Sequence, residues 1–389
     1  MRWFLYRQTK AVIHLEHLTH NVRELKLLNG SSSFFCPMVK ANAYGHGDLE
    51  IAKHLEGIGI QTMGVSLIEE GILLREAGIL SEILVFGIFD QEGAQAIVRH
   101  RLTPVLSIWS QIYDLEKVLT SQIKVHLKFD TGMHRLGFLP MEAVKLQSHF
   151  QDSKKLKLGG VLTHLHSAED ASDFAGKSFS QLKQFKTICD HFLYFNPVFH
   201  SLNSAGLLNF SKHQGQVLPF SIPAAQGARP GLALYGLTPV PGFTQFKPVM
   251  SIRSQVVRYH QLSIGQTVSY GGTWRAQRES VIGVVPIGYA DGYHRTLSNK
   301  SEVLFAGKKV SQVGNICMDF FMIDVTDVVK DKALSSFQNQ EVTLFGYDRE
   351  GNQLGAEDLA KRAGTISWEI LTSVGERVPR IFERAEVHA

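Results

Sequence analysis

The sequence predicts an α/β protein in which a (β/α)8 TIM-type barrel is followed by a mainly antiparallel β domain. Between about residues 33 and 236, short apolar or β-branched runs alternate with polar loops and helical patterns, as in parallel sheets with crossover helices. After a Pro/Gly-rich segment at 238–242, longer alternating runs separated by glycines indicate antiparallel strands. The 389 residues also exceed the needs of one barrel and favour two domains.

Eight short runs are the predicted barrel strands. No G-x-G-x-x-G sequence follows the first run, which favours a closed barrel over a dinucleotide-binding sheet. A helical pattern at 17–28 precedes them. The predicted strands are residues 34–40, 62–66, 82–87, 103–106, 123–130, 158–164, 197–204 and a last one within 226–236.

The second domain begins where the alternating runs begin. Its expected strands lie in 251–262, 280–290, 301–314 and 341–348. Two short helices follow at 356–364, with Gly364 as C-cap, and at 365–374. We therefore expect the barrel at 13–240, the β domain at 241–389, and a segment at 1–12 that pairs with the β domain.

Composition excludes several classes of protein. A net charge of +4 speaks against a charge-driven nucleic-acid binder, and 44% hydrophobic residues speak against a disordered chain. Cys36, Cys189 and Cys317 lie far apart and form no C-x-x-C, which predicts neither a disulfide framework nor a thiolate zinc site. With no membrane-length apolar run and no signal-peptide pattern, we expect a soluble cytoplasmic protein.

Residues that follow barrel strands are the candidates for chemistry, because barrel active sites lie at the carboxyl ends of the strands. Lys40 ends the first run, and a partly desolvated lysine there can form a Schiff base with an aldehyde cofactor. A lone lysine at a strand end is more often a surface residue. Ser204, Arg229 and Gly231 follow the seventh and eighth runs, where barrels commonly bind phosphate. Together these residues describe a cofactor with an aldehyde at one end and a phosphate at the other.

Two further strand ends carry ionisable side chains. Arg135 follows the fifth run and suits a substrate carboxylate, although an exposed arginine paired with an acid is an equal reading. His164 and His166 form an H-x-H after the sixth run, which would place both imidazoles on one strand face. That pattern also suits a metal hydrolase, but Asp130 is the only obvious acid at a strand end.

Three glycine-rich segments of the β domain, at 268–274, 287–293 and 313–319, contain aromatic or acidic side chains. They read as hairpin turns, yet a tyrosine beside a cation can also exchange protons.

Taken together, these residues and motifs resemble those of bacterial alanine racemases that depend on pyridoxal 5′-phosphate. Nine motifs in order carry the resemblance, at 39–47, 128–137, 163–170, 200–206, 229–236, 268–274, 287–293, 313–319 and 376–382. The resemblance implies an amino-terminal barrel, a carboxyl-terminal β domain and a homodimer whose active sites need both subunits.

The resemblance also assigns roles. Lys40 would be the Schiff-base lysine and one base, and Tyr270 of the partner subunit would be the other, so that the two bases invert the centre from opposite faces. Arg229 would face the pyridine nitrogen with His200 behind it, and its permanent proton would keep that nitrogen unprotonated and discourage transamination. His164 would bond to Tyr270.

Other matched positions would bind cofactor or substrate. Phosphate and cofactor contacts would come from Tyr44, Asn203, Ser204, Gly231 and Leu232. Substrate contacts and their supports would come from Arg135, the Met318 amide of the other subunit, Lys128 (carbamylated in some members), Tyr289 at the entry and Asp319 beside it, whereas His166 has no assigned role.

One departure from the family pattern concerns the pocket. The family usually has tyrosine in an S-Y-E motif whose hydroxyl reaches the phosphate, and this chain has Trp368, a larger side chain that offers only an N–H. Asn315 and Phe320 replace a frequent arginine and a frequent glutamine.

The implied function is interconversion of L-alanine and D-alanine, which supplies D-alanine for peptidoglycan, with no nucleic-acid or membrane partner. The alternatives are a broader small-amino-acid racemase that accepts serine, a non-catalytic pyridoxal-phosphate carrier, and a barrel decarboxylase. Retention of Tyr270 favours the racemase, because a carrier or a decarboxylase needs no second base.

Overall fold

A computed structural model describes residues 6–30, 34–170, 174–212 and 227–383. The chain forms two compact units. The barrel unit comprises Leu18–Ala43 and Asp48–Lys247, and the β unit comprises Met1–His17, Tyr44–Gly47 and Pro248–Ala389. Residues 1–5 of the segment expected at 1–12, and residue 226 of the last expected barrel strand, lie outside the described residues.

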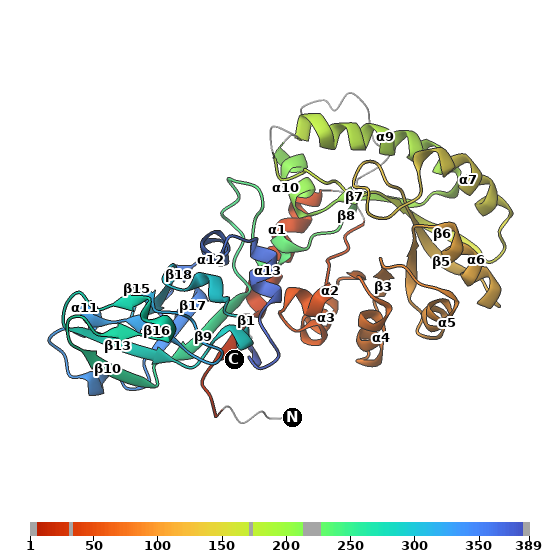
Figure 1. Ribbon diagram of the computed structural model, residues 1–389. Coiled ribbons are helices and arrows are strands. Elements are labelled where there is room, and N and C mark those ends of the chain that lie inside the picture. Colours follow the sequence, from red (N-terminus) through yellow and green to blue (C-terminus); the bar gives the residue numbers. More distant parts are fainter. Residues whose placement is uncertain (1–5, 31–33, 171–173, 213–226, 384–389) are drawn as a thin grey trace, which may run out of the picture. The chain divides into compact units, whose positions relative to one another are not determined.

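A parallel sheet of seven strands forms the interior of the barrel unit (Figure 1). Successive strands of the chain are neighbours in it, which is the order that βα alternation predicts. Its members, in sheet order, are β2 (Thr62–Val65), β3 (Glu82–Val85), β4 (Thr103–Leu106), β5 (Ile123–Lys128), β6 (Leu156–Leu162), β7 (Val198–Leu202) and β8 (Gly227–Ala228).

Residues 34–40, predicted as the first barrel strand, form no continuous strand: Phe35 and Met38 make isolated bridges, and Lys40 already belongs to the following turn. Phe35 pairs with Ala228 of β8, and Met38 pairs with Gly64 of β2. The Val39 amide also donates to the Gly64 carbonyl at 2.9 Å. Pro37 has no N–H to give to a ladder, which is one reason the pairing is interrupted. The segment nevertheless connects β8 to β2 and closes the barrel, so the predicted α/β barrel class is confirmed with one edge weaker than expected.

Helices follow the barrel strands, and their buried positions face the sheet. In α5 (Gln91–Arg99), for example, the Asp90 carboxylate accepts the Gly93 amide as N-cap, and Ala94 and Ile97 are fully buried. The other helices are α1 (Leu15–Asn29, in this unit from Leu18 on), α3 (Asp48–Gly57), α4 (Ile68–Glu76), α6 (Trp109–Val118), α7 (Ala143–Asp152), α9 (Phe179–Asp190) and α10 (Ser204–Lys212).

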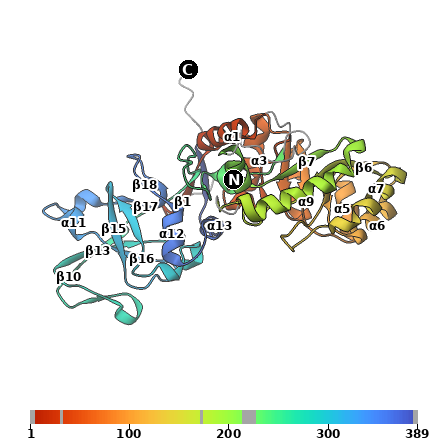
Figure 2. The same ribbon diagram turned by 90° about the horizontal axis from the view of Figure 1, so that it is seen from above.

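The β unit is built on a mostly antiparallel sheet, as predicted (Figures 1 and 2). Its order is β10-β13-β16-β15-β14-β17-β9-β1-β19, and among the described strands of this sheet only β1 and β19 pair in parallel. The strands are β1 (Lys10–His14), β9 (Met250–Gln255), β10 (Arg258–Leu262), β13 (Ser280–Val285), β14 (Glu302–Phe305), β15 (Lys308–Val313), β16 (Phe321–Asp324), β17 (Glu341–Tyr347) and β19 (Arg380–Glu383), with β18 (Gln353–Leu354) beside β17 and the separate hairpin of β11 (Thr267–Val268) and β12 (Trp274–Arg275).

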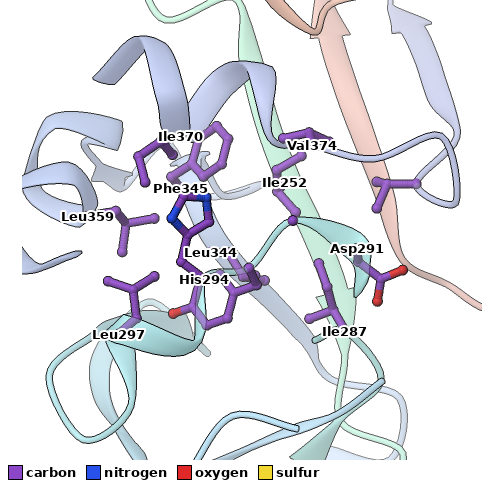
Figure 3. A pocket seen from close by; sticks show the side chains of 13 residues that line it. Ile252, Ile287, Asp291, His294, Leu297, Leu344, Phe345, Leu359, Ile370 and Val374 are labelled. Carbon is purple, nitrogen blue, oxygen red and sulfur yellow. The ribbon is translucent and has the colours of Figure 1, made fainter. Parts of the chain in front are cut away.

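Helices α11 (Thr326–Val329), α12 (Ala356–Ala363) and α13 (Ser367–Thr372) complete this unit. Gly364 ends α12 in the left-handed conformation at φ 75°, as its C-cap position predicts. Apolar side chains such as Ile252, Leu344 and Ile370 line a small void of about 20 Å3 in the core (Figure 3). That is room for about one water molecule, so this void is too small for a substrate.

Among the helices of the described residues, none has both the length and the apolar character that crossing a membrane requires.

Candidate active site

Lys40 lies at the start of a left-handed turn that follows the barrel-closing segment. In α2 (Lys40–Tyr44), the residues after Lys40 have φ between 52° and 53°, so this short element is no ordinary right-handed helix. Such a conformation costs an L-residue about 1–2 kcal/mol. Within the barrel unit, the Glu70 carboxylate accepts the Ala41 amide at 2.6 Å and the Asn42 side chain accepts the Asp48 amide at 2.9 Å. These contacts hold a strained backbone next to a lysine, a situation typical of functional sites.

The amines at this mouth of the barrel lose protons more readily than free lysines. Burial, followed by the charge of Arg135, lowers the pKa of Lys40, and Glu70 opposes the shift. Burial and then Arg135 and Arg229 lower the pKa of Lys128 to about 8. A neutral amine is the nucleophilic form, so both lysines are suited to react with a carbonyl carbon.

Arg229 is buried behind these lysines and is held by three acceptors. Its Nη1 donates to the His200 carbonyl at 2.6 Å and lies 2.9 Å from His200 Nδ1, and its Nη2 donates to the Thr163 carbonyl at 2.6 Å. Burial lowers the pKa of this guanidinium only to about 10, so it stays charged at neutral pH. A fixed cation therefore lies within the carboxyl-terminal end of the barrel.

His164 and His166 follow β6 instead of forming its end, because β6 stops at Leu162. The one-face strand geometry predicted for the H-x-H therefore does not apply. Burial, then Arg229 and Lys128, lowers the pKa of His164 well below the usual value, and His166 Nδ1 pairs with the Ser167 hydroxyl at 2.6 Å. Within the residues described, no group of three or more His, Cys, Asp or Glu side chains is placed to hold a metal ion.

Ser204 lies where α10 begins and forms a small polar cradle with two backbone amides. Its hydroxyl accepts the Gly231 amide at 3.0 Å and the Ala233 amide at 3.2 Å. Leu232 begins the short helix η4 (Leu232–Tyr235). Asn203 stabilises the same loop, because its side chain donates to the Leu165 carbonyl and accepts the Gly206 amide. Backbone amides gathered around a hydroxyl form the type of site that binds phosphate.

In the β unit, Tyr270 begins the short helix η5 (Tyr270–Gly272), and 73% of it is exposed. The Asn315 side chain donates to its carbonyl at 2.8 Å, and the Ser269 hydroxyl donates to the Asn315 carbonyl at 2.6 Å. Asn315, a departure from the family pattern, thus holds the backbone of the segment that presents the phenol.

Met318 and Tyr289 lie on adjoining segments of the same unit. The Ala290 amide donates to the Met318 carbonyl at 3.1 Å, and a Cβ at Gly288 would lie 2.4 Å from that oxygen, so the close approach requires glycine. Asp319 accepts from Arg377 at 2.7 Å. An open groove of about 740 Å3 is lined by Tyr270, Met318, Asp319 and Phe320 among others.

Tyr44 and Trp368 also belong to the β unit. Gly45, at φ 84°, packs against the end of α13, since a Cβ there would lie 2.2 Å from the Leu371 carbonyl oxygen. Trp368 is the second residue of α13 and is partly exposed, whereas Tyr44 is buried, which raises the pKa of its phenol to about 12. The tryptophan thus lies on the helix against which the Tyr44–Gly45 segment packs.

The donor set of the barrel unit fits pyridoxal phosphate. An amine with lowered pKa suits its aldehyde, a buried guanidinium suits its ring nitrogen, and the Ser204 cradle suits its phosphate. These three chemistries come from Lys40, Arg229 and Ser204, all on the carboxyl-terminal side of the strands of one barrel.

Two residues of this site were absent from the sequence prediction. His126 is two positions before Lys128 on β5, and the two-residue period of a strand places both on one face. Glu70, which holds the Ala41 amide, carries no sequence signal beyond an ordinary capping position at the start of α4.

Comparison with known proteins agrees with this geometry. Residues 13–239 match the alanine racemase amino-terminal domain family, and residues 249–382 match the alanine racemase carboxyl-terminal domain family. An alanine racemase of Sorangium cellulosum is 37% identical, with 97% of this chain and 99% of the relative covered, and one of Thermodesulfovibrio yellowstonii is 37% identical over 97% and 98%.

Solved structures agree as well. The alanine racemase from D-cycloserine-producing Streptomyces lavendulae has a TM-score of 0.86 at 27% identity and covers 98% of each chain. The Bartonella henselae alanine racemase with covalently bound pyridoxal phosphate has a TM-score of 0.83 at 30% identity, covering 97% of this chain and 99% of that one.

Proposed function

Because the chain belongs to the alanine racemase family, we propose that it interconverts L-alanine and D-alanine with pyridoxal phosphate and two bases, Lys40 and Tyr270 of a second copy. The enzyme class, an amino-acid racemase, follows from the family. The observation that carries the proposal is the placement of Lys40, Arg229 and the Ser204 cradle on the carboxyl-terminal side of one barrel.

Lys40 is the base on one face of the substrate. Its lowered pKa makes the neutral amine, the form that can remove the proton from the α-carbon, easier to reach than in a free lysine. Bound pyridoxal phosphate supplies the electron sink that makes this proton acidic. The Glu70 contact to the Ala41 amide fixes the backbone beside the amine, so the base is oriented before substrate arrives.

Tyr270 is the base on the opposite face and comes from the partner. Its high exposure and its place in the 740 Å3 groove support a role at an interface with a second copy. Met318 and Tyr289 lie on adjoining backbone segments. The Met318 amide would bind the substrate carboxylate together with Arg135, and the Tyr289 ring would narrow the entry to the site. The His164 imidazole, neutral because of its lowered pKa, can accept a hydrogen bond from the hydroxyl of the partner's Tyr270.

Arg229 disfavours transamination, the side reaction of this chemistry. A guanidinium held by two carbonyls gives up no proton, so it would hold the ring nitrogen of the cofactor without protonating it. That contact would favour returning a proton to the α-carbon over transamination.

We place the reaction in the cytoplasm, where its product D-alanine supplies peptidoglycan. The three free cysteines, of which Cys36 and Cys189 are buried, are typical of a reducing compartment.

The first test is incubation of the purified protein with pyridoxal phosphate and pure L-alanine in D2O, followed by chiral separation and mass detection. We expect α-deuterated D-alanine from the wild type and none from Lys40→Ala, which should also lose the cofactor's imine absorbance. A wild-type protein that retains the cofactor but forms no D-alanine would contradict the proposal, and turnover of serine alone would redirect it to a broader racemase.

Tyr270→Phe separates the two bases. We expect it to slow α-proton removal from one enantiomer more than from the other, measured as solvent exchange from L-alanine and from D-alanine separately. Equal losses from both would argue against two distinct bases.

A further inference from the structure

A second buried imidazole, from His126 on β5, extends the hydrogen-bond chain behind Arg229. His126 Nδ1 lies 2.9 Å from His200 Nε2, and His200 Nδ1 lies 2.9 Å from Arg229 Nη1. All three side chains are at least 96% buried and belong to the barrel unit. This series of hydrogen bonds therefore runs from the Arg229 cation through His200 to the His126 imidazole.

The donor and acceptor properties of these groups leave one arrangement of protons. A guanidinium only donates, so His200 Nδ1 is the bare nitrogen and accepts from Arg229. His200 then carries its proton on Nε2 and donates it to His126 Nδ1. Burial, followed by nearby cations, keeps the pKa of both imidazoles low, to about 3 for His126, so neither takes up a second proton near neutral pH.

The fold makes room for His126 at this position. The register of β5 and β6 shifts between Val125 and His126, a bulge of the kind that redirects side chains. Beside it, a Cβ at Gly160 would lie 2.3 Å from His126 Nδ1. The Phe34 ring packs 4.4 Å from the His200 ring and 5.9 Å from the His126 ring, between centroids. The imidazole pair is thus packed into one orientation.

We propose that His126 is a positioning residue that fixes the tautomer and orientation of His200 and, through it, the guanidinium of Arg229. With the acceptor His126 Nδ1 absent, the His200 Nε2–H group would be buried without a partner, and the alternative tautomer, with the proton on Nδ1, would place an N–H against Arg229, where donor meets donor. The effect of His126 on catalysis would act through the cofactor nitrogen that Arg229 is proposed to hold. The kinetic part of this inference therefore rests on the proposed function.

Two variants separate hydrogen bonding from packing. His126→Asn places an amide oxygen two bonds from Cβ, the position that Nδ1 occupies, and keeps an acceptor. His126→Leu fills similar space with a methyl group and removes the acceptor. His149→Leu is the matched control, since His149 is a partly buried histidine on α7 that bonds to Glu116 away from this chain of side chains.

The first measurement needs no turnover. In the 15N-histidine-labelled holoenzyme, we expect a downfield, slowly exchanging N–H proton from His200 Nε2 that does not titrate between about pH 6 and pH 9. It should disappear in His126→Leu, shift in His126→Asn and stay unchanged in His149→Leu. A resonance indifferent to His126→Leu, or none in the wild type, would overturn the proposal.

The second measurement is kinetic. His126→Leu should lower kcat for alanine about tenfold, which is about 1.4 kcal/mol, with KM within about threefold, and His126→Asn should stay within about threefold of wild type in both. The leucine variant should also release more pyruvate per racemisation, a side reaction in which the amino group of alanine passes to the cofactor and water supplies the carbonyl oxygen.

Equal losses in both His126 variants, or an unchanged pyruvate fraction, would assign His126 a packing role only. If His126→Leu does not fold, the wild-type and His126→Asn resonances still test the proposal. An unshifted resonance in His126→Asn would refute the hydrogen bond between His200 Nε2 and His126 Nδ1. Failure of the wild type to racemise alanine would refute the proposed function and leave the N–H resonance as an independent result.

Discussion

Replacing Lys128 with methionine should stabilise the apoprotein by about 3 kcal/mol at pH 7 and hardly at all at pH 11. Lys128 is 6% exposed, and burial followed by Arg135 and Arg229 lowers its pKa from 10.5 to about 8. The shift is 10.5 − 8 = 2.5, and at about 1.36 kcal/mol per pKa unit it corresponds to roughly 3 kcal/mol against the charged form. Methionine keeps the apolar stem and removes that cost.

The pH dependence follows from proton binding. Below pH 8 Lys128 is charged in both states, and the folded protein bears the full cost. Between pH 8 and 10.5 the unfolded chain binds more protons than the folded one, so wild-type stability rises with pH relative to the variant. Above pH 10.5 the amine is neutral in both states, and the difference disappears.

The assay is urea unfolding followed by far-ultraviolet circular dichroism at pH 7, 9 and 11 in bicarbonate-free buffer, since carbon dioxide would carbamylate a neutral amine. Lys157→Met, at an exposed position of β6, is the control and should change stability by no more than about 0.5 kcal/mol at any pH. A gain in Lys128→Met that does not vary with pH, or a loss at pH 7, would refute the reasoning.

Three further predictions concern packing and selectivity. Gly160→Ala should lower stability by about 1–3 kcal/mol in thermal unfolding, because its Cβ would meet His126 at 2.3 Å; unchanged stability would contradict this contact. Asp291→Asn should cost about 3–5 kcal/mol in the same assay, because Asp291 is buried and accepts both Arg7 nitrogens at 2.9 Å; a loss below about 1 kcal/mol would show the pair to be dispensable. Trp368→Tyr should raise the serine-to-alanine ratio of kcat/KM about three- to tenfold by opening the pocket, and an unchanged ratio would remove Trp368 from the substrate site.

The α/β class followed from alternation along the chain, because each βα unit is local. The segment 34–39 differs, since its apolar run reads as a strand but its partners, Ala228 and Gly64, are distant in sequence and pair at single positions only. How many residues of this segment pair with the neighbouring strands depends on how the barrel closes, and no local sequence pattern predicts that.

The left-handed turn after Lys40 could not be predicted from its residues. Alanine and tyrosine disfavour positive φ, and the contacts that hold the turn come from Glu70 and Asp48. His126 is similar: the strand period places it beside Lys128, but its partner His200 lies 74 residues further on. The sequence therefore allows residues at strand ends to be identified. Their contact partners across the barrel can be identified only once the register of the sheet is known.

Mixing two inactive variants tests most directly whether the second base comes from another copy. The Lys40→Ala and Tyr270→Ala variants, each alone, are expected to be inactive toward L-alanine. After unfolding and refolding together, heterodimers would contain one site with both bases intact, so roughly a quarter of wild-type activity should return. No recovery, with mixed dimers demonstrated by mass, would contradict a racemase whose Lys40 and Tyr270 act from different subunits.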